Sequence, residues 1–303
     1  MGHFWSHRHA RRRGATANLD TSERQAADAV ARSFGEGYNA PLVSVVHAPE
    51  GKTFDNVQLP GINRALAQSD SIKTVRPMGV SPDKTLALFS VIPTTGADSD
   101  STKDLVHSLR SDNGKLTGIT GTRIGVTGLT AINLDISEKL AQVLPLYITI
   151  IVVLSLIVLL VVFRSLVIGV KATAGFLLTI GATFGIMTAI FQWGWFNQII
   201  GFDTPGPILS FLPIMVTGIL YGLAMDYEVF LVSSMREAHV HGHHGRQAVV
   251  RGFEQASRVV VAAAIIMVSV FAGFILSDDS MVKQFGLALA VGILIDAFLI
   301  RMA

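Results

Sequence analysis

Apolar residues are concentrated in the second half of the chain, in five long stretches that contain almost no charged side chains. A run of about 18 or more apolar residues is long enough to cross a bilayer as a helix. Only short polar segments separate the runs, which is not typical of a soluble core. We therefore expect residues 141–303 to form a transmembrane domain with five helices, at about 143–163, 172–191, 208–232, 257–276 and 284–300.

The preceding segment, residues 21–140, has the alternating short apolar runs of a soluble α/β domain. Thr21 or Ser22 is a suitable cap for a helix that ends near Phe34. A later helix begins near Leu129 and is expected to continue into the first membrane helix. Between these two helices, the order strand, helix, strand, strand, helix, strand predicts a split βαβ, ferredoxin-like domain. Its expected elements are strands at 41–47, 71–76, 85–92 and 123–128 and helices at about 57–68 and 100–111.

Charge follows the same division, because residues 1–140 hold 30 of the 46 Asp, Glu, Lys and Arg side chains. The formal net charge is only +2, which predicts no general affinity for nucleic acid. The lack of cysteine excludes a disulfide scaffold, and the 50% share of hydrophobic residues excludes a disordered chain. Residues 1–20 are rich in Arg and His, and we expect them to form a disordered basic arm.

Lys and Arg near the ends of the membrane helices predict their orientation, because these residues accumulate on the cytoplasmic side. One set of loops has six of them, and the other set has only Lys283. Trp193 and Trp195 would then lie at the outer interface. The first membrane helix would begin outside, so residues 21–140 would be extracytoplasmic. The six residues on the cytoplasmic side are Arg164, Lys171, Arg236, Arg246, Arg251 and Arg301.

This topology needs an upstream element that carries residues 21–140 across the membrane. Residues 1–20 lack the apolar segment of a signal peptide. Five membrane helices is also an odd number for a chain that begins and ends in the cytoplasm. We therefore expect the chain to be part of a longer protein whose preceding membrane helix is missing here.

An ionisable residue inside a membrane helix is costly and is usually functional. Asp226 lies ten residues before Arg236, about 15 Å along a helix and near the middle of the bilayer core. A carboxyl group that binds and releases a proton at this depth suits a proton-driven machine. We therefore expect Asp226 and the adjacent Tyr227 to form a proton relay. Their side chains point about 100° apart on a helix, so each needs a partner on another helix.

Two further acidic residues in the apolar stretches are candidate secondary intramembrane charges. Glu228 lies closer to the cytoplasm, where its side chain can extend to the interface or cap a helix. Asp296 lies about a turn and a half before Arg301. A structural ion pair near the interface is therefore at least as good an interpretation of Asp296 as a role in the relay.

Small residues predict where the membrane helices approach one another. Gly181 and Gly185 are four residues apart, as are Gly218 and Gly222, and this spacing stacks two glycines on one helix face. The three alanines at 262–264 offer similar clearance. We expect close contacts between helices at these positions.

Four histidines are clustered in a predicted cytoplasmic loop. No cysteine accompanies them and their spacing is not that of a helical metal site, so we interpret the cluster as a hydrated loop. We expect neither a metal nor a cofactor, with protons as the coupling ion. The cluster consists of His239, His241, His243 and His244.

Several motifs, in a fixed order, resemble the MmpL-type transporters of the resistance-nodulation-division superfamily, including their YdfJ-like members. The resemblance covers about residues 20–303. Ser234 is one small departure, since members often have Arg at this point. The motifs are SFGEGYNAPL at 33–42, TGLTAINLDI at 127–136, FRSLVIGVKATAGFLL at 163–178, GLAMDYEVFLVSSMREA at 222–238 and VKQFGLALAVGILIDAFLIRM at 282–302.

Such transporters have two similar halves, each with one membrane helix, an α/β porter domain and five more helices. This chain resembles the C-terminal half without its leading helix. The resemblance implies proton-motive-force-driven export of lipids or other hydrophobic compounds across the bacterial inner membrane, with Asp226 and Tyr227 as the second-half relay pair. It implies membrane lipids, a hydrophobic substrate and a first half with a matching Asp–Tyr pair as partners.

Two other classes of function are alternatives to an exporter. An aspartyl intramembrane protease would use Asp226 and Asp296, but the TyrAsp and GlyXaaGlyAsp motifs of that class are absent. A serine-type membrane protease needs a histidine within a membrane helix, and the sequence offers none. We therefore expect no enzyme. A truncated or non-transporting membrane interaction protein, or a homo-oligomer, is compatible with the same residues.

Overall fold

The computed structural model divides the chain into two compact units, Met1–Glu138 and Lys139–Ala303. The helix α5 (Leu129–Phe163) is continuous across the boundary, as the sequence predicted. The structure describes residues 22–54, 58–111, 121–163, 165–196, 200, 206–241, 245–277 and 279–300. The predicted basic arm at 1–20 lies outside this part of the chain.

The first unit contains a small antiparallel sheet with the strand order β2-β3-β1-β4. Burial alternates along β1 and β4, because one face of the sheet is covered and the other is open. β2 is longer than its predicted range, and its register shifts between Pro77 and Gly79. A bulge of this kind lets a strand include residues that disfavour one. The strands are β1 (Leu42–His47), β2 (Ile72–Val80), β3 (Leu86–Pro93) and β4 (Arg123–Thr127).

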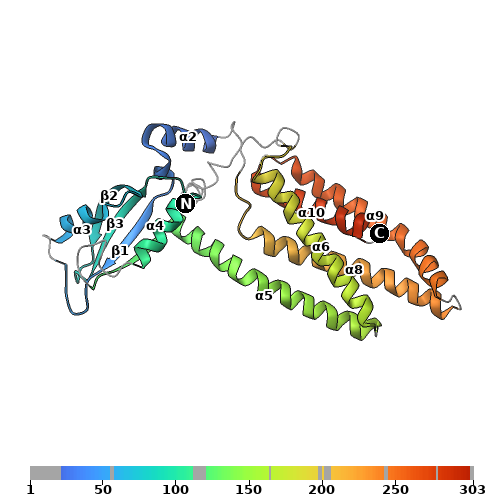
Figure 1. Cartoon of the computed structure of the whole chain (residues 1–303). Helices are drawn as coiled ribbons and strands as arrows, with labels where there is room; N and C mark the ends of the chain where they lie inside the picture. Colours follow the sequence, from blue (N-terminus) through green and yellow to red (C-terminus); the bar gives the residue numbers. More distant parts are fainter. Residues whose placement is uncertain are drawn as a thin grey trace. The chain divides into compact units, whose positions relative to one another are not determined.

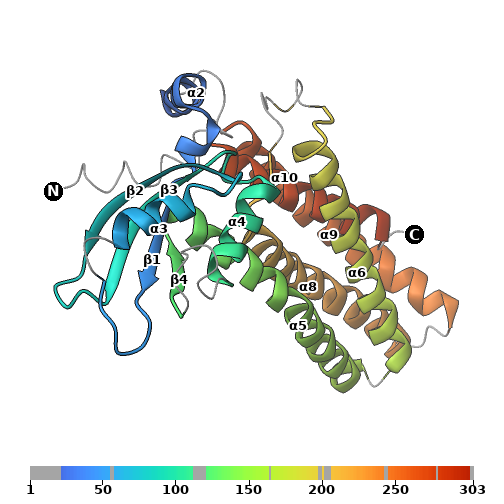
Figure 2. The same ribbon diagram turned by 60° about the vertical axis from the view of Figure 1, so that its left-hand side comes forward.

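Helices α3 and α4 supply the apolar side chains that cover one face of this sheet (Figure 2). Phe89 on β3 is fully buried in this core, together with Ile62 of α3 and Leu109 of α4. Ala131 and Leu134, in the first turns of α5, complete the cluster. The helices among the described residues of this unit are α2 (Ser22–Phe34), the 3-10 turn η1 (Glu36–Asn39), α3 (Gln58–Leu66) and α4 (Asp100–Arg110).

An ion pair ties the start of α5 to the first unit, which is called the soluble unit from here on, as the second is called the membrane unit. Arg110, the last residue of α4, donates to both carboxylate oxygens of Asp135, and its Nη2 is 2.8 Å from Oδ2. The same guanidinium donates to the carbonyl of Val126 on β4 at 3.0 Å. Bidentate pairing of this kind fixes geometry as well as charge. The base of α5 is thus held by both a helix and a strand.

Within its described residues, the second unit has five helices that are long and apolar enough to cross a membrane (Figure 1). The prediction of five membrane helices is confirmed, and the protein is a multi-pass membrane protein. Pro145 lies inside α5, at the start of its most apolar part. The others are α6 (Leu166–Phe191), α8 (Leu212–Val240), α9 (Arg246–Ile275) and α10 (Ser280–Leu294), which continues as the π-helical segment η2 (Ile295–Ile300).

The long loop expected at 233–256 is largely helical. α8 extends to Val240 and α9 begins at Arg246, so Arg236 and Arg251 lie on helices. Polar residues lower the hydropathy of these turns without ending the helix, since Arg, Glu and Gln are good helix formers. Hydropathy marks the apolar part of a helix and misses such polar extensions.

Lys283 was also expected in a loop, and this prediction is wrong. It lies in the first turn of α10, where it is only 6% exposed. Its amino group donates to the carbonyl of Ile200 at 3.5 Å. Asp279 precedes it as the N-cap, accepting from the amide of Met281 at 2.7 Å. The cap allows α10 to begin four residues before the predicted start.

Close helix contacts occur at Gly218 and at the buried Ala264, as predicted, but not at the other three predicted glycines. A Cβ added to Gly181, Gly185 or Gly222 would meet open space in this chain. A Cβ on Gly252 of α9 would instead collide with the backbone of Met235 on α8. A Cβ on Gly286 of α10 would lie 2.7 Å from the carbonyl oxygen of Phe271 on α9. Of the four predicted glycines only Gly218 is crowded, by the hydroxyl of Tyr147 on α5. The predicted spacing identifies helix faces made of small residues, but it does not show which of these faces contacts another helix.

Candidate functional site

Asp226 is the middle residue of the 29-residue helix α8. It is exposed in this chain and lies on a stripe of exposed residues along the helix. The spacings of three and four place these residues on one face. The opposite side of α8 is buried through Val216, Leu220 and Ala224. The stripe consists of Met215, Ile219, Gly222, Asp226, Phe230 and Ser233.

Tyr227 faces the neighbouring helix rather than the exposed stripe. Its hydroxyl donates to the sulfur of Met267 on α9 at 3.1 Å. Its ring packs against a small buried cluster formed by Leu231, Ala256 and Val260. The two members of the predicted relay pair therefore point to different sides of α8, as their 100° separation requires.

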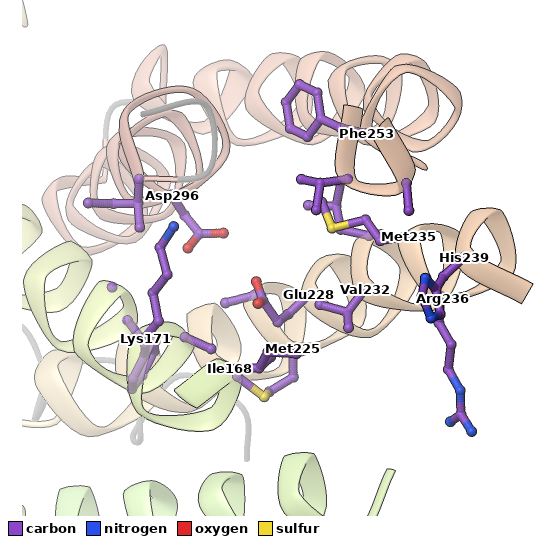
Figure 3. A pocket seen from close by; sticks show the side chains of 18 of the residues that line it. Ile168, Lys171, Met225, Glu228, Val232, Met235, Arg236, His239, Phe253 and Asp296 are labelled. Atoms are coloured by element: carbon purple, nitrogen blue, oxygen red, sulfur yellow. The ribbon is translucent and has the colours of Figure 1, made fainter. Parts of the chain in front are cut away.

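Glu228 and Asp296 both line a cavity of about 750 Å³ inside the membrane unit (Figure 3). Asp296, on the π-helical segment η2, is only 5% exposed, and Glu228 is half-buried. Arg301, the predicted partner of Asp296, lies outside the described residues. The cavity is formed by the start of α6, the end of α8, the start of α9 and η2. Its other lining residues include Ile168, Lys171, Met225, Val232, Met235 and Phe253.

Lys171, Glu228 and Asp296 are directed into the same part of the cavity (Figure 3). Figure 3 shows the Lys171 amino group directed at the Asp296 carboxylate, with the Glu228 carboxylate on the same side of the space. Arg236 also borders the cavity, but its guanidinium points away and donates to the carbonyl of Val162 on α5 at 3.2 Å. The cavity thus has a charged end and a wall of Met, Val and Phe side chains.

Comparison with known proteins places these residues in a family. Residues 15–302 match the MMPL family. This chain belongs to the MMPL family. Over 285 residues, 93% of the chain, it is 41% identical to the membrane protein YdfJ of Bacillus subtilis. That match covers 38% of YdfJ, so the chain spans less than half the length of this relative.

Shorter matches relate this MMPL chain to proteins named for lipid export. The mycolic acid-containing lipids exporter MmpL11 of Mycolicibacterium smegmatis is 38% identical over 116 residues, which are 38% of this chain and 12% of that protein. The probable trehalose monomycolate exporter MmpL3 of Mycobacterium leprae is 38% identical over 117 residues, 39% of this chain and 12% of the relative. The resemblance to MmpL-type transporters is confirmed.

Lys171 is a residue of the MMPL chain whose place in the cavity the sequence did not predict. It was counted only as a positive charge in a loop, because the second apolar stretch was taken to begin at residue 172. α6 in fact begins at Leu166, five residues earlier than Lys171. The apolar run at 166–170 is the signal that could have placed Lys171 inside the helix.

The histidine cluster is only partly described. His239 lies on α8, and His241 follows its end with a ring nitrogen 2.8 Å from the carbonyl of Glu237. His243 and His244 lie outside the described residues. Within the part of the chain that the structure covers, no group of three His, Cys, Asp or Glu side chains could hold a metal ion.

Proposed function

We propose that this chain is the C-terminal half of an exporter that uses the proton-motive force to move lipids or other hydrophobic compounds across the bacterial inner membrane. The family match and the lipid-export names of two relatives support the class of function. The 38% share of YdfJ that the chain covers supports the status of a half. Export would then need the remainder of such a protein.

The observation that carries the proposal is the place of Asp226. A carboxylate at the centre of a membrane helix is costly when it faces lipid. Asp226 lies on the exposed stripe of α8, which includes Gly222 one turn away. We propose that a helix of the missing half packs on this stripe and brings a matching Asp–Tyr pair to Asp226 and Tyr227. Gly222 would let that helix approach closely.

Proton coupling follows from such a buried arrangement. A carboxyl group that is protonated on one side of the membrane and deprotonated on the other changes the charge inside the helix interface. This change would favour one packing of the helices over another, which is how a bound proton shifts a conformational equilibrium. Protons are then the only coupling ligand required, and no cofactor is proposed.

The soluble unit would be the extracytoplasmic porter domain. Its element order β1, α3, β2, β3, α4, β4 and its strand order β2-β3-β1-β4 support the ferredoxin-like arrangement. Leu88 and Met78 are exposed large apolar residues of the hairpin β2–β3, in keeping with a second porter domain as partner. The alternative proposal is a non-transporting membrane interaction protein, which the partial coverage of YdfJ would also fit.

A hybrid transporter tests the proposal. Residues 15–302 would replace the matching 38% of YdfJ, and inverted membrane vesicles would be assayed for pH-gradient-driven movement of a fluorescent hydrophobic probe. We expect movement that collapses with the gradient, and its loss in the variant Asp226→Asn. Glu254→Gln is the control, because the exposed carboxylate of Glu254 lies 3.9 Å from the exposed guanidinium of Arg251, one turn away on α9. Full movement by Asp226→Asn would refute the relay.

Tyr227→Phe gives a graded test of the same site. The substitution removes the hydroxyl that donates to Met267 but keeps the ring in its cluster. We expect the hybrid to insert normally and to lose most, but not all, of its gradient-driven movement. Unchanged movement would restrict the relay to Asp226.

A further inference from the structure

The hydroxyl of Tyr227 lies against a sulfur atom of the neighbouring helix. It donates to the Met267 sulfur on α9, with 3.1 Å between oxygen and sulfur. Val260, Ala264 and Met267 are spaced by four and three residues, so they lie on one face of α9. Val260 and Ala264 are buried, and the Tyr227 ring packs in the cluster that contains Val260. This face of α9 therefore contacts Tyr227 through apolar side chains and through the Met267 sulfur.

A second sulfur atom contacts the same turn of α8 on another side. Met225, directly before Asp226, accepts from the hydroxyl of Ser155 on α5, with 3.5 Å between oxygen and sulfur. Ser155 is buried. Met225 and Tyr227 are two residues apart, so their side chains point about 200° apart around α8. The turn that carries Asp226 is thus bound to α5 and to α9 by hydrogen bonds to thioether sulfur.

Thioether sulfur is a weak hydrogen-bond acceptor. In apolar surroundings a hydroxyl without an acceptor is costly, whereas a hydroxyl with a strong acceptor is difficult to withdraw. A bond to sulfur lowers the first cost without imposing the second. Methionine is also flexible, so its sulfur can follow small movements of a neighbouring helix. These properties suit a hydroxyl that exchanges one hydrogen-bond partner for another, as a proton relay requires.

We propose that Met267 is a positioning residue of the relay, because its sulfur is the resting acceptor of the Tyr227 hydroxyl. Met267 holds this hydroxyl on the α9 side of α8 until a carboxylate of the matching Asp–Tyr pair competes for it. The hydroxyl then transfers its hydrogen bond from sulfur to the carboxylate, which is the stronger acceptor. This inference rests on the export function proposed above, since the competing carboxylate belongs to the missing half.

Fluorine NMR of the full chain in lipid nanodiscs tests the resting contact. The four tyrosines are replaced by 3-fluorotyrosine, and the signal that disappears in Tyr227→Phe is that of Tyr227. Met267→Leu conserves volume but removes the sulfur. We expect the Tyr227 signal to shift by more than its line width in this variant. It should not move in the control Met281→Leu, which changes a methionine in the first turn of α10. An unchanged Tyr227 signal in Met267→Leu would overturn the proposal.

Met267→Gln in the hybrid transporter tests the role in the relay. The amide oxygen of glutamine accepts more strongly than sulfur and should retain the Tyr227 hydroxyl on the α9 side. We expect gradient-driven movement of the fluorescent probe to fall about three- to tenfold, which corresponds to one net hydrogen bond. Met281→Gln is the matched control, because it introduces the same group on another helix, and its movement should equal that of the unaltered hybrid. Full movement by Met267→Gln would contradict the proposal.

A Tyr227→Phe background separates positioning from packing. This variant keeps the ring but has no hydroxyl for the residue at position 267 to hold. We therefore expect Met267→Gln to cause no further loss of the residual movement in this background, so that the two effects are not additive. A structural defect would lower movement by the same factor with and without the hydroxyl, and that result would refute the positioning role.

The two proposals fail separately. An unaltered hybrid that moves no probe, with a Tyr227 signal that responds to Met267→Leu in the chain alone, would refute the export function and support the resting contact. A hybrid that moves the probe, with a Tyr227 signal that does not respond to Met267→Leu, would refute only the role of Met267.

Discussion

The two units have similar interiors but different exposed surfaces. The soluble unit buries large apolar side chains such as Phe89 and Leu42, and the membrane unit likewise buries Phe191 and Met187. In the membrane unit large apolar side chains point outward, and Val161 on α5 is 71% exposed. Its interior includes Thr183, Gln284 and other polar or small residues. Large apolar side chains can be exposed on the membrane unit, because lipid is as apolar as the side chains themselves. The same surface would be unfavourable in water.

The largest expected effect sharpens this comparison on the soluble side. Phe89→Ala removes a fully buried ring between the sheet and its helices. We expect a loss of about 3–5 kcal/mol in unfolding free energy, from lost burial and the cavity left behind. Pulse proteolysis of the full chain in detergent would measure it. Leu88→Ala changes the preceding residue, which lies on the open face of the sheet, and should lower the unfolding free energy by less than about 1 kcal/mol.

The next effect contrasts two exposed valines. Val153 on α5 is 49% exposed in the membrane unit, and Val80 on β2 is 38% exposed in the soluble unit. We expect Val153→Lys to disfavour membrane insertion by about 2.5–3.5 kcal/mol, because the ammonium would enter the bilayer centre. Val80→Lys should change stability by no more than about 0.5 kcal/mol. Insertion assayed by glycosylation mapping would distinguish them, and equal effects would contradict membrane placement of α5.

The smallest effect concerns the glycines. Gly286→Ala places a methyl group against the backbone of α9 and should destabilise the membrane unit by about 1–3 kcal/mol. Gly181→Ala meets open space in this chain and should cost nothing measurable. Thermal unfolding in detergent would compare the two. A loss at Gly181 only in a full-length hybrid would show that a further helix covers that face.

The elements followed from the sequence more closely than their contacts did. Strands and helices of the soluble unit lie within a few residues of their predicted ranges, because alternating burial gives a direct pattern. The membrane helices were recognised from apolar length alone, so their polar extensions around Arg236 and Arg251 were missed. Length and hydropathy show that a helix exists, but they do not show where its polar ends stop.

The candidate site was predicted less completely than the fold. Asp226 and Glu228 stand out as rare charges in apolar stretches, and their two-residue spacing already places their side chains about 200° apart around the helix. The cavity with Lys171 and Phe253 could not be found in the same way, since its residues come from α6, α8, α9 and η2. Such a site exists only after distant segments pack, and no local pattern encodes it.

Pro145 gives α5 a mechanical property. Proline has no amide hydrogen, so the carbonyl of Ala141 loses its usual partner four residues on. The turn that ends at Pro145 therefore bends at lower cost than the rest of the 35-residue helix. The boundary between the two units falls at Glu138, only seven residues before this proline. A bending force on α5 would therefore deform this turn first, so the turn before Pro145 is the expected hinge of the helix.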